Sequence, residues 1–116
     1  MRLLRGMVAD VNLEPTLGSE TRKIRPCVIV TNNVYNGRVP VIQVVSLTQW
    51  SVRKAETKTN VEIEPSEGNG LAKASVADCL QTRPIDRRHR LIRVRGKLSP
   101  EKLYEIDMAL RVVFDL

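Results

Sequence analysis

Short apolar runs, broken at close intervals by turn-forming residues, constrain the fold of this chain more than any other feature. The runs are rich in Val and Ile and are separated by Pro, Gly and Asn, a pattern typical of short β-strands. A tight turn is expected at Asn36-Gly37, within 31–40, and a loop at 64–70. The pattern predicts strands at 5–12, 26–31, 40–47, 59–64, 72–78 and 90–96.

One segment near the C-terminus, residues 100–114, has helical periodicity instead. Ser99 is a suitable N-cap, Pro100 fits the first helical position, and Glu101 lies near the positive end of the helix dipole. The sequence therefore predicts a mainly β fold, a small and strongly bent antiparallel sheet or barrel with a C-terminal helix packed on it. The apolar residues of this helix repeat at spacings of three and four, with two more widening the stripe: Leu103, Ile106, Leu110 and Val113, then Met108 and Val112.

The length of 116 residues fits one domain, 1–116, with a real core. Apolar residues make up 42% and charged residues 28%, which excludes the composition of a disordered chain. No apolar run approaches the length of a membrane span, and the N-terminal stretch is interrupted at Arg5 before it could form a signal peptide. We therefore expect a soluble cytoplasmic protein with no membrane association.

The net charge of +6 favours polyanionic partners, nucleic acid first, although charge of this size also serves solubility. The two cysteines, Cys27 and Cys79, form no CxxC pattern, and His89 is the single histidine. Neither a zinc site nor a disulfide framework is expected, and no acidic cluster has ligand spacing. We expect no metal and no cofactor.

The stretch GSETRKIRP (18–26) is more polar than a connection between two strands requires. It holds Glu20 among Arg22, Lys23 and Arg25, whereas a plain connection needs only about two to five turn-forming residues. RNA cleavage is a reaction for which such a set suffices, because the 2′-hydroxyl of the substrate is the nucleophile. The protein then has only to align the attack, remove a proton and stabilise charge on the phosphorane.

The stretch 18–26 belongs to a longer pattern of polar residues, glycine and prolines that runs from Asn12 to Thr48. The order and spacing of this pattern resemble the MazF/PemK family of toxin endoribonucleases. The later stretch RPIDRRHRLIRVRGKLS resembles the family as well, so the resemblance covers nearly the whole chain. Two departures, Leu80 before Gln81 and Pro84 in place of a common Thr or Val, affect strand geometry and base preference rather than chemistry. The matching positions are Asn12, Pro15, Gly18, Ser19, Glu20, Arg25, Pro26, Asn32 and Thr48.

The resemblance implies a fold, an activity and partners. The fold would be an SH3-like barrel of the CcdB–MazF type, and the protein would be the toxin of a type II toxin–antitoxin system. It would be a sequence-selective, metal-independent endoribonuclease that cleaves single-stranded RNA, such as mRNA, and leaves 2′,3′-cyclic phosphate and 5′-hydroxyl ends. Its partners would be a second copy in a homodimer, with the RNA groove across the interface, and a small acidic antitoxin like MazE.

The resemblance also implies roles for individual residues. Arg25 would stabilise the phosphorane, a role that its high pKa favours over proton donation to the leaving oxygen. Thr48 would hold a phosphate oxygen, and Glu20 would act as the base for the 2′-hydroxyl or accept hydrogen bonds from a base edge. Four further residues are expected to bind RNA: Leu17, Ser19, Gln81 and Arg83.

Each of these residues also has a purely structural interpretation. Arg25 would pair with Glu20 or Asp10, Thr48 would satisfy a turn, and Glu20 would form an exposed ion pair with a neighbouring cation. Trp50 would stack on a base, or instead lie in the core or a dimer contact.

Two other functions stay open at this point. One is a non-catalytic poison of DNA gyrase on the same fold, as in CcdB-like proteins, for which Arg25 and Thr48 would have no purpose. The other is a basic barrel that binds RNA without cutting it.

Overall fold

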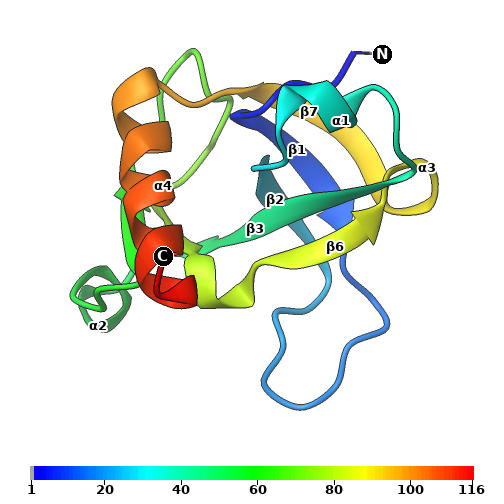
Figure 1. Ribbon diagram of the computed structural model, residues 1–116. Helices are drawn as coiled ribbons and strands as arrows, with labels where there is room; N and C mark the ends of the chain where they lie inside the picture. Colours follow the sequence, from blue (N-terminus) through cyan, green and yellow to red (C-terminus); the bar gives the residue numbers. More distant parts are fainter. Residues whose placement is uncertain (1) are drawn as a thin grey trace.

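The computed structural model describes residues 2–116, in which the strands form a bent antiparallel sheet with a long helix beside it (Figure 1). The strands are β1 (Met7–Asn12), β2 (Ile24–Ile29), β3 (Val41–Gln49), β4 (Asn60–Ile63), β5 (Ser75–Asp78), β6 (Arg83–Asp86) and β7 (Leu91–Lys97). The helical segments are α1 (Asn33–Asn36), α2 (Val52–Ala55), the 3₁₀ turn η1 (Cys79–Gln81), α3 (Arg87–Arg90) and α4 (Pro100–Phe114).

The long strand β3 is where the sheet folds over. Neighbouring strands follow the order β4-β5-β3-β2-β1-β7, and β6 also pairs with β3. The first half of β3, Val41 to Val44, pairs with β6, whereas its end, Leu47 to Gln49, pairs with β5. Within residues 2–116 the two end strands, β4 and β7, are not paired with each other. The mainly β fold with a C-terminal helix is therefore confirmed, and the predicted barrel is a sheet that bends without closing.

Two apolar clusters form the core, one on each side of the bent sheet. One lies between the sheet and α4 and includes Val45, Leu47 and Ile106. The other includes Leu13 and Ile42 and extends to β6 and β7. Both consist largely of Val, Ile and Leu, because aromatic residues make up only 3% of the chain. Burial of such side chains is the main source of stability for a domain of this size.

Helix α4 begins and ends as the sequence predicts. The Ser99 hydroxyl accepts a hydrogen bond from the backbone N–H of Lys102 at 3.3 Å, and the helix ends at Asp115 in the left-handed region. Ile106 is fully buried, whereas Tyr104 and Val112 are exposed. Of the helices in residues 2–116, none combines the length and apolar character that a bilayer crossing requires.

Three sequence-based assignments were wrong. Strand β6 was missed because Pro84 interrupts its pattern. Within residues 2–116, β6 pairs only with β3, so a proline is tolerated there. The loop was extended to 26, but β2 already begins at Ile24. In place of a tight turn at Asn36-Gly37, α1 forms a helical turn whose N-cap, Asn32, accepts a hydrogen bond from the N–H of Val34.

Candidate active site

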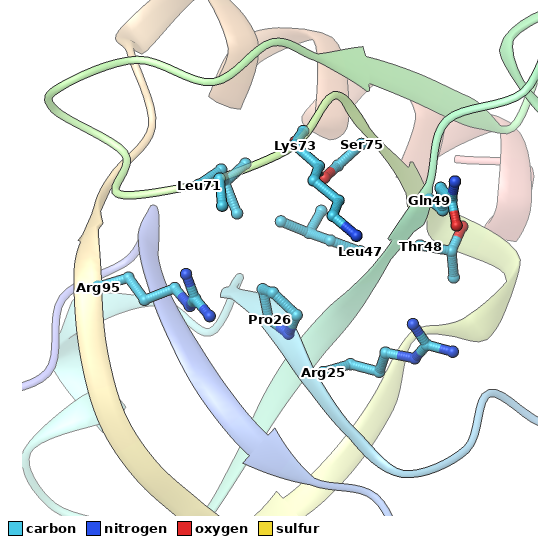
Figure 2. A pocket seen from close by; sticks show the side chains of 10 residues that line it. Arg25, Pro26, Leu47, Thr48, Gln49, Leu71, Lys73, Ser75 and Arg95 are labelled. Atoms are coloured by element: carbon cyan, nitrogen blue, oxygen red, sulfur yellow. The ribbon is translucent and has the colours of Figure 1, made fainter.

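Arg25 and Thr48 are distant in the sequence, and the ladder between β2 and β3 brings them together. Cys27 on β2 pairs with Ser46 on β3. Because the strands are antiparallel, a step of two residues outward along each strand places Arg25 across from Thr48. Both side chains line one pocket of about 230 Å³ (Figure 2). The two residues to which the sequence analysis gave phosphate contacts thus share a site.

The Arg25 guanidinium is free of carboxylate partners. Its Nε donates a hydrogen bond to the carbonyl of Arg22 at 3.2 Å, and no ion pair within residues 2–116 includes Arg25. The structural alternative for Arg25 was therefore wrong, because Asp10 pairs with Arg93 and Arg95 instead. The Nη atoms of Arg25 are left to donate to a ligand in the pocket.

Thr48 also lacks a partner for its polar group. Its backbone pairs with Val76 on β5, while its hydroxyl oxygen is buried and makes no hydrogen bond within the described chain. A buried hydroxyl without a partner costs about 1–3 kcal/mol. The interpretation that this hydroxyl satisfies a turn was wrong. A phosphate oxygen that accepted a hydrogen bond from Thr48 would remove the cost.

The rest of the pocket adds cations that the sequence analysis did not assign to the site. Lys73 and Arg95 line it together with Arg25, and its lining holds no carboxylate. Pro26, Leu47 and Leu71 form an apolar wall between the charged groups (Figure 2). In the sequence, Arg93 and Arg95 alternate with Ile92 and Val94, which indicates outward-pointing cations and gives only moderate support for a phosphate contact. The position of Arg95 in the pocket depends on sheet pairing, which the sequence pattern does not reveal.

Asp10 on β1 fixes two of the arginines on β7. Its carboxylate accepts hydrogen bonds from Nε of Arg95 at 2.6 Å and from Nε of Arg93 at 2.8 Å. Burial raises the pKa of the Asp10 carboxyl, but the hydrogen bonds and charges of Arg95 and Arg93 outweigh this and hold the pKa below its ordinary value. The carboxylate is therefore ionised at neutral pH and positions Arg95 at the pocket.

Three of the predicted site residues lie instead on the loop between β1 and β2, residues 13–23, which projects from the sheet (Figure 1). A Glu20 carboxylate oxygen accepts a hydrogen bond from the N–H of Leu17 at 2.6 Å, and the Leu17 side chain is 81% exposed. Glu20 takes part in no ion pair within residues 2–116, so the proposed pairing with Arg22 or Lys23 was wrong. Leu17, Ser19 and Glu20 are not among the residues that line the pocket.

Gln81 and Arg83, the other two predicted RNA contacts, hold this loop by its backbone. The amide of Gln81 donates to the carbonyl of Ser19 at 3.4 Å and accepts from the N–H of Thr21 at 3.3 Å. Arg83 donates to the carbonyl of Leu13 at 3.2 Å. Both side chains orient the loop that carries Leu17, Ser19 and Glu20.

Glu14 and Arg90, which the sequence analysis did not single out, stabilise the start of the loop. Arg90 donates to the carbonyls of Asn12 and Glu14 at 3.0 and 2.6 Å. The Glu14 carboxylate accepts hydrogen bonds from Thr16 and from the N–H of Lys23. The Thr16 hydroxyl is the main reason that the pKa of Glu14 lies below its ordinary value.

Other side chains with reactive or recognition potential lie outside the pocket. Trp50 is half-exposed and its Nε1 donates to the Glu62 carboxylate, so its placement in the core was wrong. Cys27 and Cys79 are buried as free thiols, and burial raises the pKa of each to about 12. Residues 2–116 hold no group of three or more His, Cys, Asp or Glu side chains arranged to bind a metal.

Comparison with known proteins identifies the family. A family model for the PemK-like, MazF-like toxins of type II toxin–antitoxin systems matches residues 4–114. This chain belongs to that family. It is also 37% identical over 112 residues to an endoribonuclease MazF from Staphylococcus epidermidis, covering 97% of this chain and 91% of that protein. The resemblance in the sequence is confirmed.

Solved structures share the fold of this MazF-like toxin. MazF from Deinococcus radiodurans superposes with a TM-score of 0.82 at 19% identity, over 100% of this chain and 99% of that one. An endoribonuclease from a mycobacterial species, in complex with its cognate antitoxin, superposes with a TM-score of 0.79 at 23% identity, over 98% and 96% of the two chains. The Arg25–Thr48 pocket is the candidate active site of the toxin.

Proposed function

We propose that this toxin, an endoribonuclease, cuts single-stranded RNA in the Arg25–Thr48 pocket by attack of a ribose 2′-hydroxyl on the adjacent phosphorus. The observation that carries the proposal is the juxtaposition, across β2 and β3, of a guanidinium whose Nη atoms have no partner within residues 2–116 and a buried hydroxyl without a hydrogen bond. A phosphate in the pocket would meet two donors that are in place before substrate arrives. Preorganised donors of this kind are usually the largest contribution to catalysis.

The proposed reaction needs no nucleophile from the protein. A base takes the proton of the 2′-hydroxyl, the O2′–P bond forms, and charge accumulates on the phosphorane oxygens near Arg25 and Thr48. The P–O5′ bond then breaks and the 5′-oxygen takes a proton. The products are a 2′,3′-cyclic phosphate and a 5′-hydroxyl, and no metal ion is required because neither water nor hydroxide attacks.

The loop 13–23 is the proposed source of the base and of further RNA contacts. Glu20 is the candidate base or base-edge acceptor, and it must exchange its hydrogen bond with Leu17 for one with RNA. The exposed Leu17 and Ser19 are proposed to contact nucleotides beside the cut. Gln81 and Arg83 would act through the loop, because their donors already hold its backbone.

A second copy of the chain is the proposed partner of helix α4. One face of the helix buries Ile106, whereas Tyr104 and Val112 on another face are 62% and 60% exposed and line a hollow together with Met108. Apolar surface of this kind marks an interaction site. A two-fold axis would bury this exposed face in both copies and join two cationic pockets into one groove for RNA.

An acidic antitoxin of the MazE type is the proposed regulator. Its charge would complement the net charge of +6. A disordered acidic segment could order itself along the RNA groove and so compete with RNA directly. The mycobacterial relative in complex with its cognate antitoxin supports this proposal.

The decisive experiment incubates the purified protein with RNA in EDTA and maps the ends of the fragments. We expect 2′,3′-cyclic phosphate and 5′-hydroxyl ends, while an RNA with 2′-deoxyribose at the scissile position binds and stays whole. Binding without cleavage would favour the non-cutting barrel, and neither binding nor cleavage would favour the CcdB-like poison. Cutting of the deoxy substrate would show that water or a metal hydroxide attacks.

Arg25→Ala tests the assignment of the pocket. Removing one preorganised donor from a transition state costs about 100- to 1,000-fold in rate, and we expect a loss of that size with the melting temperature unchanged. Arg22→Ala is the matched control, because Arg22 lies three residues before Arg25, is exposed and does not line the pocket. Activity of Arg25→Ala within a few-fold of wild type would remove Arg25 from the mechanism.

A further inference from the structure

The candidate active site has a second cationic end that the proposed chemistry does not use. Arg95 and Lys73 line the pocket, and Figure 2 shows Arg95 and Arg25 on opposite sides of Pro26. A single phosphate bound by Arg25 and Thr48 leaves this end empty. Arg95 lies at this end, and Figure 2 shows the Lys73 ammonium group pointing into the pocket between Arg95 and Thr48. Two cations are therefore available to a further anion in a pocket whose lining holds no carboxylate.

Arg95 is held in place by hydrogen bonds. Its Nε donates to Asp10 at 2.6 Å, and its Nη1 donates to the carbonyl of Gly70 at 3.0 Å. Nη2 makes no hydrogen bond within residues 2–116 and is left for a ligand. Asp10 is shared with Arg93, so one carboxylate faces two guanidinium groups and the surplus positive charge persists.

The loop that carries Lys73 is fixed against the same strand. Gly70 has a φ of 68°, and a Cβ there would overlap the backbone of Arg95, so only glycine allows this approach. A Cβ on Gly96 would likewise overlap the backbone of Gly68, and the N–H of Lys97 donates to the carbonyl of Gly68 at 2.8 Å.

The buried side chain of Asn69 fixes the shape of this loop from within. It accepts hydrogen bonds from the N–H groups of Ser66 and Leu71 and donates to the carbonyl of Glu64. Lys73, which follows, has no partner for its ammonium group within the described chain. The loop backbone that leads to Lys73 is held in place, while the ammonium group of Lys73 is available to a ligand.

We propose that Arg95 and Lys73 bind a second phosphate of the RNA backbone, next to the scissile phosphate held by Arg25 and Thr48. This inference rests on the proposed function and extends it to a neighbouring nucleotide. Pro26 lies between Arg95 and Arg25 (Figure 2), and together with Leu47 and Leu71 it offers an apolar surface for the sugar and base between the two phosphates. The second site would fix the register of the strand and leave the bond-breaking step to Arg25.

The first test measures binding without cleavage. A fluorescein-labelled, mixed-sequence DNA hexamer is titrated with Arg95→Gln, Lys73→Gln and Arg93→Gln at several salt concentrations. Each phosphate contact contributes about 0.7 to the salt slope for single strands, so Arg95→Gln and Lys73→Gln should each lower it by about that amount. Arg93→Gln is the matched control, because Arg93 binds the same Asp10 but does not line the pocket. Equal slopes in Arg95→Gln and Arg93→Gln would overturn the site.

The second test locates the phosphate. An RNA hexamer that the wild type cuts is made with 2′-deoxyribose at the scissile position, and an uncharged methylphosphonate replaces the phosphate on either side in turn. At one of the two positions we expect the methylphosphonate to lower the affinity of the wild type about tenfold. The Arg95→Gln variant should bind that same RNA no more weakly than the wild type does. If the affinity losses from Arg95→Gln and from the methylphosphonate add at both positions, the proposal is overturned. A changed base preference in Arg95→Gln, without coupling to either methylphosphonate, would assign Arg95 to a base instead.

Two features keep the proposal separable from the proposed function. Lys73→Gln alters an exposed side chain without partners, so it tests the site even if Arg95→Gln destabilises the fold through Asp10. A wild type that cuts no RNA would defeat the proposed function alone, because the salt slopes with the DNA hexamer are measured regardless.

Discussion

At the scale of single residues, the site is marked by polar groups that the fold leaves without partners. Arg25 lacks a carboxylate, and the buried Thr48 hydroxyl lacks any hydrogen bond within the described chain. A folded chain normally pairs such groups. Groups left unpaired around one pocket indicate a ligand that completes them, and the stability lost in this way is typical of functional sites.

Thr48→Val separates function from stability. The substitution keeps the shape of the side chain and removes an unpaired buried hydroxyl, so we expect the melting temperature to rise by about 2–5 °C. The rate of RNA cleavage should fall at least about tenfold, because one hydrogen bond to the phosphate is lost. Calorimetry and a cleavage assay on the same sample measure both effects. A lower melting temperature would mean that the hydroxyl has a structural partner after all.

The sequence indicates which residues could belong to the site better than it indicates what each of them contacts. Arg25 and Thr48 could be proposed because each belongs to a pattern along the chain. Lys73 could not, and Arg95 had only moderate support from strand alternation, because their place in the pocket depends on which strands are neighbours and on a loop packed against β7. Gln81 and Arg83 were expected to bind RNA, yet their hydrogen bonds to the loop backbone appear only once the chain is folded.

At the scale of elements, the strongly periodic segments were predictable and the interrupted ones were not. Helix α4 matches its predicted range of 100–114, since capping residues and apolar spacing agree. Strand β6 was missed because its four residues include a proline and too few alternating positions to form a pattern. The loop between β1 and β2 stood out by composition, but its anchors come from residues 60 or more positions away.

The link between β1 and β7 through Asp10 predicts a pH-dependent stability. The pKa of Asp10 is lower in the folded protein than in the unfolded chain, so its pairs with Arg93 and Arg95 stabilise the fold above about pH 4. That contribution is lost as the pH falls through the folded-state pKa. We expect Asp10→Asn to lower the melting temperature most near pH 7, with the difference from wild type shrinking below about pH 4. A difference that is constant with pH would exclude this linkage.

The link between η1 and the loop 13–23 predicts an effect on substrate binding. Gln81→Ala removes hydrogen bonds to both Ser19 and Thr21, so the loop should sample more conformations before RNA binds. We expect a KM several-fold higher, a kcat changed less, and faster hydrogen exchange at the N–H of Thr21. Leu80→Ala is the control, because Leu80 is next to Gln81, is exposed and has no side-chain group that could hydrogen-bond the loop. Unchanged exchange at Thr21 would contradict the anchoring role.

At the scale of the whole molecule, charge and apolar surface are arranged for different partners. The cations of the pocket gather at the junction of β2, β3, β7 and the loop before β5, where a polyanion would bind. Tyr104 and Val112, which the fold leaves exposed on α4, lie along a hollow shared with β4, which suits a protein surface instead. This separation allows one chain to bind RNA with one region and a copy of itself with another.

The proposed homodimer makes the final prediction. Val112 is 60% exposed, and it lines the hollow on α4 together with Tyr104 and Met108. In a two-fold dimer, Val112→Glu would bury a charge without a partner, so the variant should be monomeric at micromolar concentration while wild type scatters light at twice the chain mass. Val34→Glu introduces the same change at an exposed valine on α1 and should stay dimeric. A monomeric wild type would defeat the dimer, whereas two monomeric variants would mean that α4 is not the specific interface.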